Sequence, residues 1–227
     1  MSALAALLQL SSATLPVGAY SYSQGLESAI EAGWVSDESS ARQWIETVLS
    51  EGIARTEAVI VARTFDALAQ GSVGDLVLIN ARFLASRETR ELLAETLQMG
   101  RSMRLLVVST PGVDGAVRQQ LDDLEADEGL GYPIAWAVAA MARGLDTETA
   151  LLGYLYAALE NIVLAAVKTV PLGQSAGQRL LTELGQGLAM MVSVARDCPL
   201  DELTNFLPGQ IMASMQHEHQ HTRLFSS

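Results

Sequence analysis

Cysteine and lysine each occur only once in the 227 residues, and both shortages limit the possible functions. The single Cys198 excludes an internal disulfide and any zinc site built from several cysteines, so the reducing cytoplasm is the expected compartment. The single Lys168 lies in no loop of the type G-x-x-x-x-G-K-[ST], so the chain is not expected to hydrolyse a nucleotide. A G-x-S-x-G elbow is also absent. The sequence therefore predicts a protein that is not an enzyme, with no catalytic, cofactor-binding or metal-binding residues of its own.

Positive charge is scarce in this sequence. Lysine and arginine together number 14 against 26 acidic residues, which gives a net charge of −12. Nucleic acids and anionic membrane surfaces attract proteins of the opposite sign, so neither is an expected partner. A basic protein partner fits the charge better.

Long uninterrupted apolar runs are missing as well. No charged residue precedes Glu27, but the N-terminus lacks a basic region, and polar residues between Ser11 and Thr14 interrupt its apolar run. No secretion signal is therefore predicted. The most apolar stretch, residues 149–167, contains Glu160, so we interpret it as a buried core helix rather than a membrane span.

The residues that are abundant favour helices. Hydrophobic residues make up 49% of the chain but aromatic residues only 5%, and alanine and leucine dominate over the residues that form strands. No segment shows the alternation of period two that a strand requires. The expected fold is all-α, a single-domain helical bundle of about eight to ten helices covering residues 1–227. The expected helices are 22–32, 38–68 with a loosened point at Gly52, 75–84, 87–108, 117–124, 133–142, 150–170, 179–195 and 211–217.

Turn and cap residues set the expected boundaries. Ser21 and Gln24 have the S-x-x-Q spacing of a capping box, which predicts a helix start near Tyr22, and Gly33 is placed to end that helix. Asp37 is expected to cap the helix over residues 38–68. Asp146 or Thr147 is expected to cap the helix over residues 150–170.

Weaker signals mark three further boundaries. Ser86 is a plausible cap before residue 87, and Ser175 with Gln178 repeats the capping-box spacing. The acidic run 122–128 is the best candidate for a linker.

A histidine-rich motif near the end of the chain suggests an alternative function. Residues 217–221 read HEHQH, which matches the H-E-x-x-H motif of zinc-dependent hydrolases, in which Glu218 would be the base. A zinc protease needs a third ligand, and the six residues that follow contain no His, Asp or Glu. A polar tail helix that docks on a partner is the favoured interpretation.

Arginines are concentrated in one region of this acidic chain. Glutamates 88, 91 and 95 lie among them, so ion pairing along a helix surface is one interpretation. Recognition of carboxylates on another subunit is the other, because the planar guanidinium suits that task. The five arginines are Arg82, Arg87, Arg90, Arg101 and Arg104.

Three blocks of the sequence carry a resemblance to a known family. Residues 10–35 read LSSATLPVGAYSYSQGLESAIEAGWV, residues 80–102 contain NARFLASRETREL and QMGRS, and residues 171–181 read PLGQSAGQRLL. Together they closely resemble the signature blocks of the UreF family of urease accessory proteins. The ending HEHQHTRLFSS also resembles the family's ending, except at His221 and Ser226.

The resemblance implies a chaperone-like role in metalloenzyme maturation. Members of that family assemble with UreD (also called UreH) and the GTPase UreG on the urease apoprotein, form dimers within such complexes, and help to couple GTP hydrolysis to nickel binding and nickel insertion. The candidate partner-binding residues that lie in the matching blocks or beside them are Tyr20, Glu27, Glu31, Lys168, Gln174, Arg223, Leu224 and Phe225. A helical binding module unrelated to urease is the third possible function.

The resemblance also suggests a role for the C-terminal tail. Residues 206–227 are too apolar for a solvated extension and too short to fold alone, so we expect UreD to order them. Within that tail, Arg223 is expected to contact Tyr20 by a cation–π interaction or a hydrogen bond to the phenol.

Overall fold

The computed structural model describes residues 2–227, and within this range every regular element is helical. This confirms the all-α class, although the α-helices, which run from α1 to α12, exceed the eight to ten that were expected. Short 3₁₀ segments lie at Ala19–Ser21 and Leu200–Glu202. The α-helices are α1 Ala3–Leu10, α2 Leu26–Glu31, α3 Glu38–Thr47, α4 Glu57–Ala69, α5 Asp75–Ala85, α6 Arg90–Val108, α7 Gly115–Asp127, α8 Tyr132–Ala142, α9 Thr147–Thr169, α10 Gln174–Gly185, α11 Leu188–Asp197 and α12 Pro208–His217.

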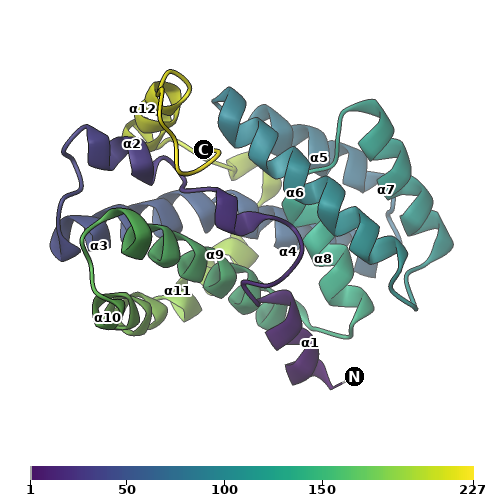
Figure 1. Ribbon diagram of the computed structural model, residues 1–227. Coiled ribbons are helices and arrows are strands. Elements are labelled where there is room, and N and C mark those ends of the chain that lie inside the picture. The colour runs from purple at the N-terminus through teal and green to yellow at the C-terminus, as the bar shows by residue number, and fades with distance from the viewer. Residues whose placement is uncertain (1) are drawn as a thin grey trace.

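Helix α9 is the central element of the molecule. It crosses the middle of the bundle in Figure 1 and packs against α1, α2, α4, α10 and α11. Asp146 caps it, as expected, by accepting a hydrogen bond from the Thr149 amide at 2.8 Å. By length and composition α9 could cross a membrane. It also contacts α3 and α8, and this packing on all sides supports the prediction of a core helix.

Helices α6 and α8 share the most extensive helix–helix contact in the described structure. A Cβ atom added at Gly100 of α6 would lie 1.9 Å from the Leu130 carbonyl oxygen, so only glycine allows this approach. The side chain of Asn80 on α5 fixes the same loop, because it donates to the Gly129 carbonyl at 2.9 Å and accepts from the Gly131 amide at 2.9 Å. The residues that make this crossing therefore come from the 80–102 block.

The single helix expected over residues 38–68, loosened at Gly52, is divided in the structure into α3 and α4, and Gly52 lies in the segment between them. Asp37 caps α3 by accepting from the Ser40 amide at 2.8 Å. A π-helical segment, Val48–Ile53, then joins α3 to α4. The Leu207 side chain lies 2.7 Å from the position of a Cβ at Gly52, so the segment just before α12 packs against this joint.

The expected capping box at the start of α2 is wrong. Ser21 belongs to a 3₁₀ turn, and α2 begins only at Leu26, behind Gly25 with φ +77°. The Gln24 side chain is not free to cap the helix because its amide donates to Glu95 on α6. The predicted end is confirmed, since Gly33 has φ +75° and its amide donates to the Ile30 carbonyl at 2.9 Å.

Three other boundaries also differ from the sequence prediction. The expected linker at 122–128 is mostly helix, and Arg101 and Arg104 of α6 pair with Glu125 and Asp122 of α7 at 2.7 and 2.5 Å. Helix α10 begins behind Gly173 without a capping box and is separated from α11 near residue 186. Helix α6 is capped by Thr89 rather than by Ser86.

Candidate partner-binding surface around the C-terminal strap

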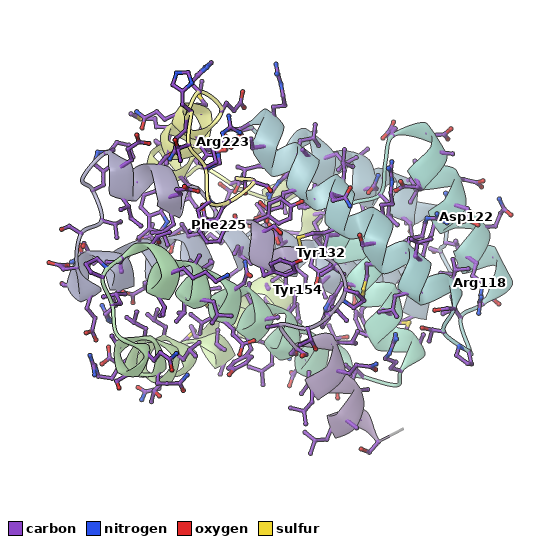
Figure 2. The ribbon with its side chains drawn as sticks, in the orientation of Figure 1. Arg118, Asp122, Tyr132, Tyr154, Arg223 and Phe225 are labelled. Atoms are coloured by element: carbon purple, nitrogen blue, oxygen red, sulfur yellow. The ribbon has the colours of Figure 1, made fainter. Side chains whose placement is uncertain are left out.

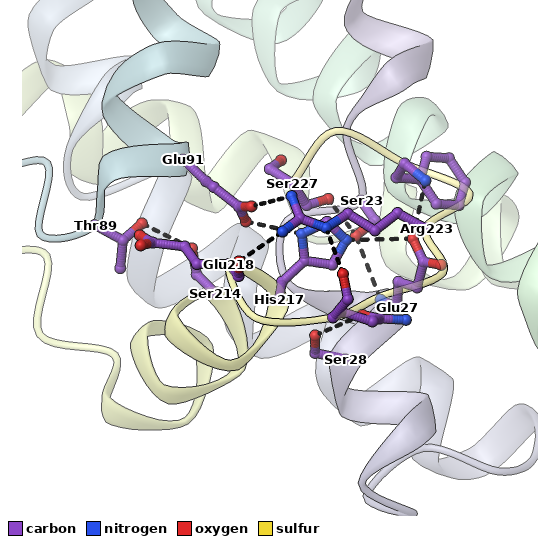
Figure 3. A network of polar contacts seen from close by, with 12 residues as sticks. Ser23, Glu27, Ser28, Thr89, Glu91, Ser214, His217, Glu218, Arg223 and Ser227 are labelled. Carbon is purple, nitrogen blue, oxygen red and sulfur yellow. Dashed lines mark hydrogen bonds and ion pairs between the residues drawn. The ribbon is translucent and has the colours of Figure 1, made fainter.

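The last ten residues fold back over α2 and α6. We call residues 218–227 the strap. It follows α12, which packs against α2, and in Figure 1 α2, α12 and the C-terminus lie at the same end of the molecule. Figure 3 shows that most of the polar contacts of this region join the strap and α12 to α2 and the first turns of α6.

Glu27 holds the strap directly. It lies in the first turn of α2, and its two carboxylate oxygens accept hydrogen bonds from the backbone amides of Leu224 at 2.8 Å and Phe225 at 2.9 Å. A carboxylate that accepts from backbone amides makes stronger hydrogen bonds than a neutral acceptor does. Glu27 therefore faces its own chain rather than solvent.

His217 lies between two carboxylates and is fully buried. Its Nδ1 atom is 2.8 Å from Glu91 and its Nε2 atom 3.4 Å from Glu27. Arg223 completes the cluster by pairing with Glu91 at 3.0 Å and donating to the carbonyl oxygens of Glu218 and Gln220. The cluster joins α2, α6, α12 and the strap (Figure 3).

A second buried contact holds the far end of the strap. Glu95 on α6 accepts from the Gln24 amide at 2.5 Å and from the Ser227 hydroxyl at 2.9 Å. Ser23 donates to the Ser227 backbone oxygen through both its amide and its hydroxyl. Burial, and next the charge of Glu57, raises the pKa of Glu95 to about 8, so this acid is mostly protonated at neutral pH.

A small cavity lies beside Glu95. It has a volume of about 70 Å³ and is lined by polar groups of Glu57, Arg87, Tyr132 and Tyr154, among others. Glu57 accepts from the Tyr154 hydroxyl at 2.6 Å and from Arg87 at 3.1 Å. Burial and the nearby carboxylate of Glu57 raise the pKa of both tyrosines, so both hydroxyls are neutral, and that of Tyr154 is a donor to Glu57. Figure 2 shows the two rings side by side near the centre of the molecule.

Five of the eight predicted site residues are brought together by this arrangement. Lys168, at the end of α9, places its ammonium 5.6 Å from the centre of the Phe225 ring, which is a cation–π geometry. Phe225 is buried, whereas Leu224 beside it is 64% exposed. With Glu27 and Arg223, these residues form one continuous site over the strap.

The other three predicted residues lie apart from the cluster. Tyr20 is 61% exposed and Gln174 is the exposed first residue of α10. Glu31 lines a surface hollow between α2 and α12 together with His219. The expected contact between Tyr20 and Arg223 is not formed, because the guanidinium of Arg223 is bound to Glu91 and to two carbonyl oxygens of the strap.

The arrangement of the HEHQH motif does not suit a zinc protease. Helix α12 ends at His217, so His221 does not share a helix face with it. Both ring nitrogens of His217 point at carboxylates within the fold, whereas His221 is exposed on the strap. The alternative of a zinc-dependent hydrolase built on this motif is therefore wrong in its geometry.

Sequence reasoning missed Gln24, Glu91, Glu95, His217 and Ser227 as parts of the site. One signal could have found Glu95, because it shares the apolar face of α6 with Leu92 and Met99 at helical spacing. A carboxylate on such a face needs a buried partner. The rest could not be seen, because their contacts join segments far apart in the sequence, 71 residues apart for Gln24 with Glu95 and 126 for His217 with Glu91.

Comparison with known proteins identifies the family. A model of the UreF family matches residues 35–185. The chain belongs to the UreF family. The chain is 50% identical over 221 residues to the urease accessory protein UreF of Azoarcus sp. (strain BH72), covering 97% of this chain and 94% of the relative.

Two more UreF proteins match along nearly their whole length. The protein of Dechloromonas aromatica (strain RCB) is 45% identical over 224 residues, covering 99% of this chain and 97% of the relative. That of Nitrosococcus oceani is 44% identical over 232 residues, covering all of both chains. The resemblance based on three blocks therefore extends over the whole UreF chain, and the strap lies within the compared length.

Proposed function

We propose that this chain is a non-enzymatic accessory protein of urease maturation, which assembles with UreD (UreH) and the GTPase UreG on the urease apoprotein. In this role it helps to couple GTP hydrolysis by UreG to nickel insertion. The observation that carries the proposal is membership of the UreF family, with relatives named urease accessory protein UreF over nearly the full chain. A reducing cytoplasm, expected from the single cysteine, is the proposed compartment.

The proposed contact with UreD lies at the end of the molecule formed by α2, α12 and the strap (Figure 1). Apolar side chains are exposed there, namely Leu224, Met212 and Met215, and Phe206 precedes them at 77% exposure. A group of exposed apolar residues of this kind is typical of a protein-binding surface. We infer that UreD covers the strap and secures it, with Leu224 as the central side chain of the contact.

The proposed contact with UreG lies near the junction of α9 and α10. Lys168 is the only lysine of the sequence and is exposed, and among residues 2–227 the ring of Phe225 is the one group found in contact with its ammonium. Gln174 begins α10 six residues later and is exposed as well. The ammonium of Lys168 and the side-chain amide of Gln174 are both hydrogen-bond donors, so together they could bind carboxylates of a partner. A homodimer within the assembly is part of the same proposal.

The chain would act as a scaffold between its partners. The strap and Lys168 meet at Phe225, so the proposed UreD and UreG contacts share one buried side chain. A change in the position of the strap would therefore move Phe225 and alter its contact with Lys168. This contiguity supports a role in restricting when the GTPase releases nickel.

A co-expression pull-down tests the assembly. The tagged chain is expected to retain UreD and UreG, and Leu224→Ser is expected to reduce UreD retention by roughly tenfold, since burial of one leucine side chain contributes about 1.5–3 kcal/mol. Met190→Ser is the matched control, because Met190 is 72% exposed on α11 and should leave retention unchanged. If the wild-type chain retains neither protein, the proposed function is wrong.

A further inference from the structure

Residues 22–25 carry a helix signal that the structure does not use. Ser21 and Gln24 have the S-x-x-Q spacing of a capping box, in which the two side chains satisfy free backbone N–H groups of the first helical turn. In the structure α2 begins only at Leu26, behind Gly25, and Gly25 supplies no side-chain cap. The local pattern therefore specifies a helix that is one turn longer than α2.

The backbone of this segment is strained. Among the described residues, Gln24 is the one non-glycine residue with a positive φ, at +57°, and Gly25 follows it with φ +77°. A left-handed conformation brings the Cβ atom of an L-residue close to the following carbonyl oxygen, so it is unfavourable for glutamine. A right-handed helical turn over residues 22–25 would remove this strain. The observed conformation must therefore be held by contacts from elsewhere in the fold.

Long-range hydrogen bonds hold the segment out of the helix. The side-chain amide of Gln24 donates to Glu95 of α6 at 2.5 Å, and its side-chain oxygen accepts from Gln210 of α12 at 3.0 Å. The backbone amide of Ser23 donates to the Ser227 backbone oxygen at 2.8 Å, at the end of the strap (Figure 3). As a capping residue, Gln24 would have to give up both of its side-chain contacts, because its side chain would turn back to the cap residue.

Helix α12 also packs directly against Gly25. A Cβ atom added at this position would lie 3.2 Å from the Ala213 Cβ atom and 3.3 Å from the Gln210 carbonyl oxygen. Ser23, Gln24 and Gly25 therefore all contact either α12 or the strap. The two segments that close the C-terminal end of the molecule are the ones that keep α2 short.

We propose that α2 is a two-state element: while α12 and the strap are docked it starts at Leu26, and when they undock it gains residues 22–25 as one more turn. The short form makes the contacts with α6, α12 and the strap. The long form gains the Ser21–Gln24 cap and loses the left-handed strain. Because α12 and the strap make these contacts only with the short form, their docking selects it. Undocking of the strap is thereby converted into a change in the length of α2.

Gly25→Ala tests this element, because it disfavours the short form and favours the long one. Alanine is strained at φ +77° and its Cβ would press against α12, whereas within a helix alanine is better than glycine. Backbone NMR of the full-length variant should show helical Cα shifts at residues 22–25, which the wild type should lack. In hydrogen–deuterium exchange, protection of peptide 218–227 should fall about tenfold, the ratio that corresponds to the cost of one left-handed alanine.

Gly33→Ala is the matched control at the other end of α2. Gly33 has φ +75° and nothing lies within 4 Å of a Cβ at that position, so alanine brings a similar backbone strain without touching α12. This variant should leave residues 22–25 and the strap as in the wild type. Adding Ser21→Ala to Gly25→Ala removes the cap of the long form, so the helical shifts at residues 22–25 should become smaller.

Gln210→Leu is a second variant, which leaves the sequence of α2 unchanged. It removes the amide that holds Gln24, so helical shifts should appear in part at residues 22–25, as the average of the two forms. Helical shifts together with reduced protection of the strap, in either variant, support the inference. It is overturned if residues 22–25 stay non-helical in both variants, or if they become helical while the strap keeps its wild-type protection. The two-state element concerns the free chain and goes beyond the proposed function, so its failure would leave the proposed assembly with UreD and UreG untouched.

Discussion

Glu95 places an ionisable group in the interior of the protein, and this has a consequence for stability. Its pKa of about 8 is raised above the ordinary value of 4.5, so the folded state binds the proton more tightly than the unfolded state. The stabilisation that this tighter proton binding by Glu95 gives the fold is therefore fully present below about pH 4.5, and it is lost as the pH rises to about 8. The free energy of unfolding should fall by about 1 kcal/mol for each pH unit between roughly pH 5 and 8 from this group alone.

Glu95→Gln should flatten that dependence, because an amide carries no charge at any pH. We expect the variant to resemble the wild type in urea unfolding near pH 5.5 and to exceed it by about 3 kcal/mol near pH 9. An equal pH dependence in both proteins would show that Glu95 is ionised in the folded state throughout this range.

Glu27 and Lys168 lie in the same site but should respond differently to loss of charge. Glu27→Gln weakens two hydrogen bonds to the strap backbone, so we expect a loss of about 1 kcal/mol of stability together with weaker retention of UreD. Lys168→Gln removes only the contact with Phe225, so the fold should keep its stability to within about 0.5 kcal/mol while UreG retention falls. Thermal melts and pull-downs of both variants give the comparison. A Glu27→Gln protein with unchanged strap protection in hydrogen exchange would contradict the role assigned to this carboxylate.

At the level of elements, the crossing of α6 and α8 depends on one glycine. Gly100→Ala would place a Cβ 1.9 Å from the Leu130 carbonyl oxygen, and a backbone atom cannot rotate away. We expect the free energy of unfolding to fall by about 3 kcal/mol or more, at the upper end of overpacking effects. Gly185→Ala is the control, since nothing lies within 4 Å of that position at the end of α10. The control should be neutral or slightly stabilising in a urea titration, and equal effects of the two changes would contradict the packing described here.

The strap can be removed while every residue of α12 stays in place. Deletion of residues 218–227 leaves His217 in place but removes buried Phe225, so we expect a cooperative but less stable fold, by about 2 kcal/mol. Retention of UreD should be abolished. A well-folded deletion protein that still binds UreD would show that α2 and α12 make the contact without the strap.

The sequence predicted the elements best where the determining residues are local. Asp37 and Asp146 were identified as caps because an N-cap needs only its own side chain and the next three residues. Ser21 and Gln24 show the same local spacing, yet α2 begins four residues later because Gln24 is bound to Glu95 and Gln210, far away in the sequence. A tertiary contact of this kind cannot be derived from spacing.

The candidate site was predictable only in part for the same reason. Leu224, Phe225 and Lys168 were found through the resemblance, but not the contact between the lysine and the ring. Glu27 was expected to face a partner, whereas the structure gives it an internal role as an acceptor for the strap. Residue type and family blocks indicated which residues matter, and only the fold shows which of them act on one another.

At the level of the whole molecule, the two proposed partner surfaces are joined through the buried core. Helix α9 runs through the centre of the bundle and carries Lys168 in its last turn, while the strap ends beside Glu95 and the cavity lined by Tyr132 and Tyr154 (Figure 2). In the proposed function the molecule has no catalytic role and brings UreD, UreG and the urease apoprotein into one assembly.

Reconstituted urease activation tests that central claim most directly. Purified apoprotein, UreD, UreG, GTP, bicarbonate and nickel are combined with and without this chain, and nickel content and urease activity are measured. We expect both to depend on the chain and on GTP hydrolysis, so a non-hydrolysable GTP analogue should prevent activation. Equal nickel incorporation and equal activity in the absence of the chain would contradict it.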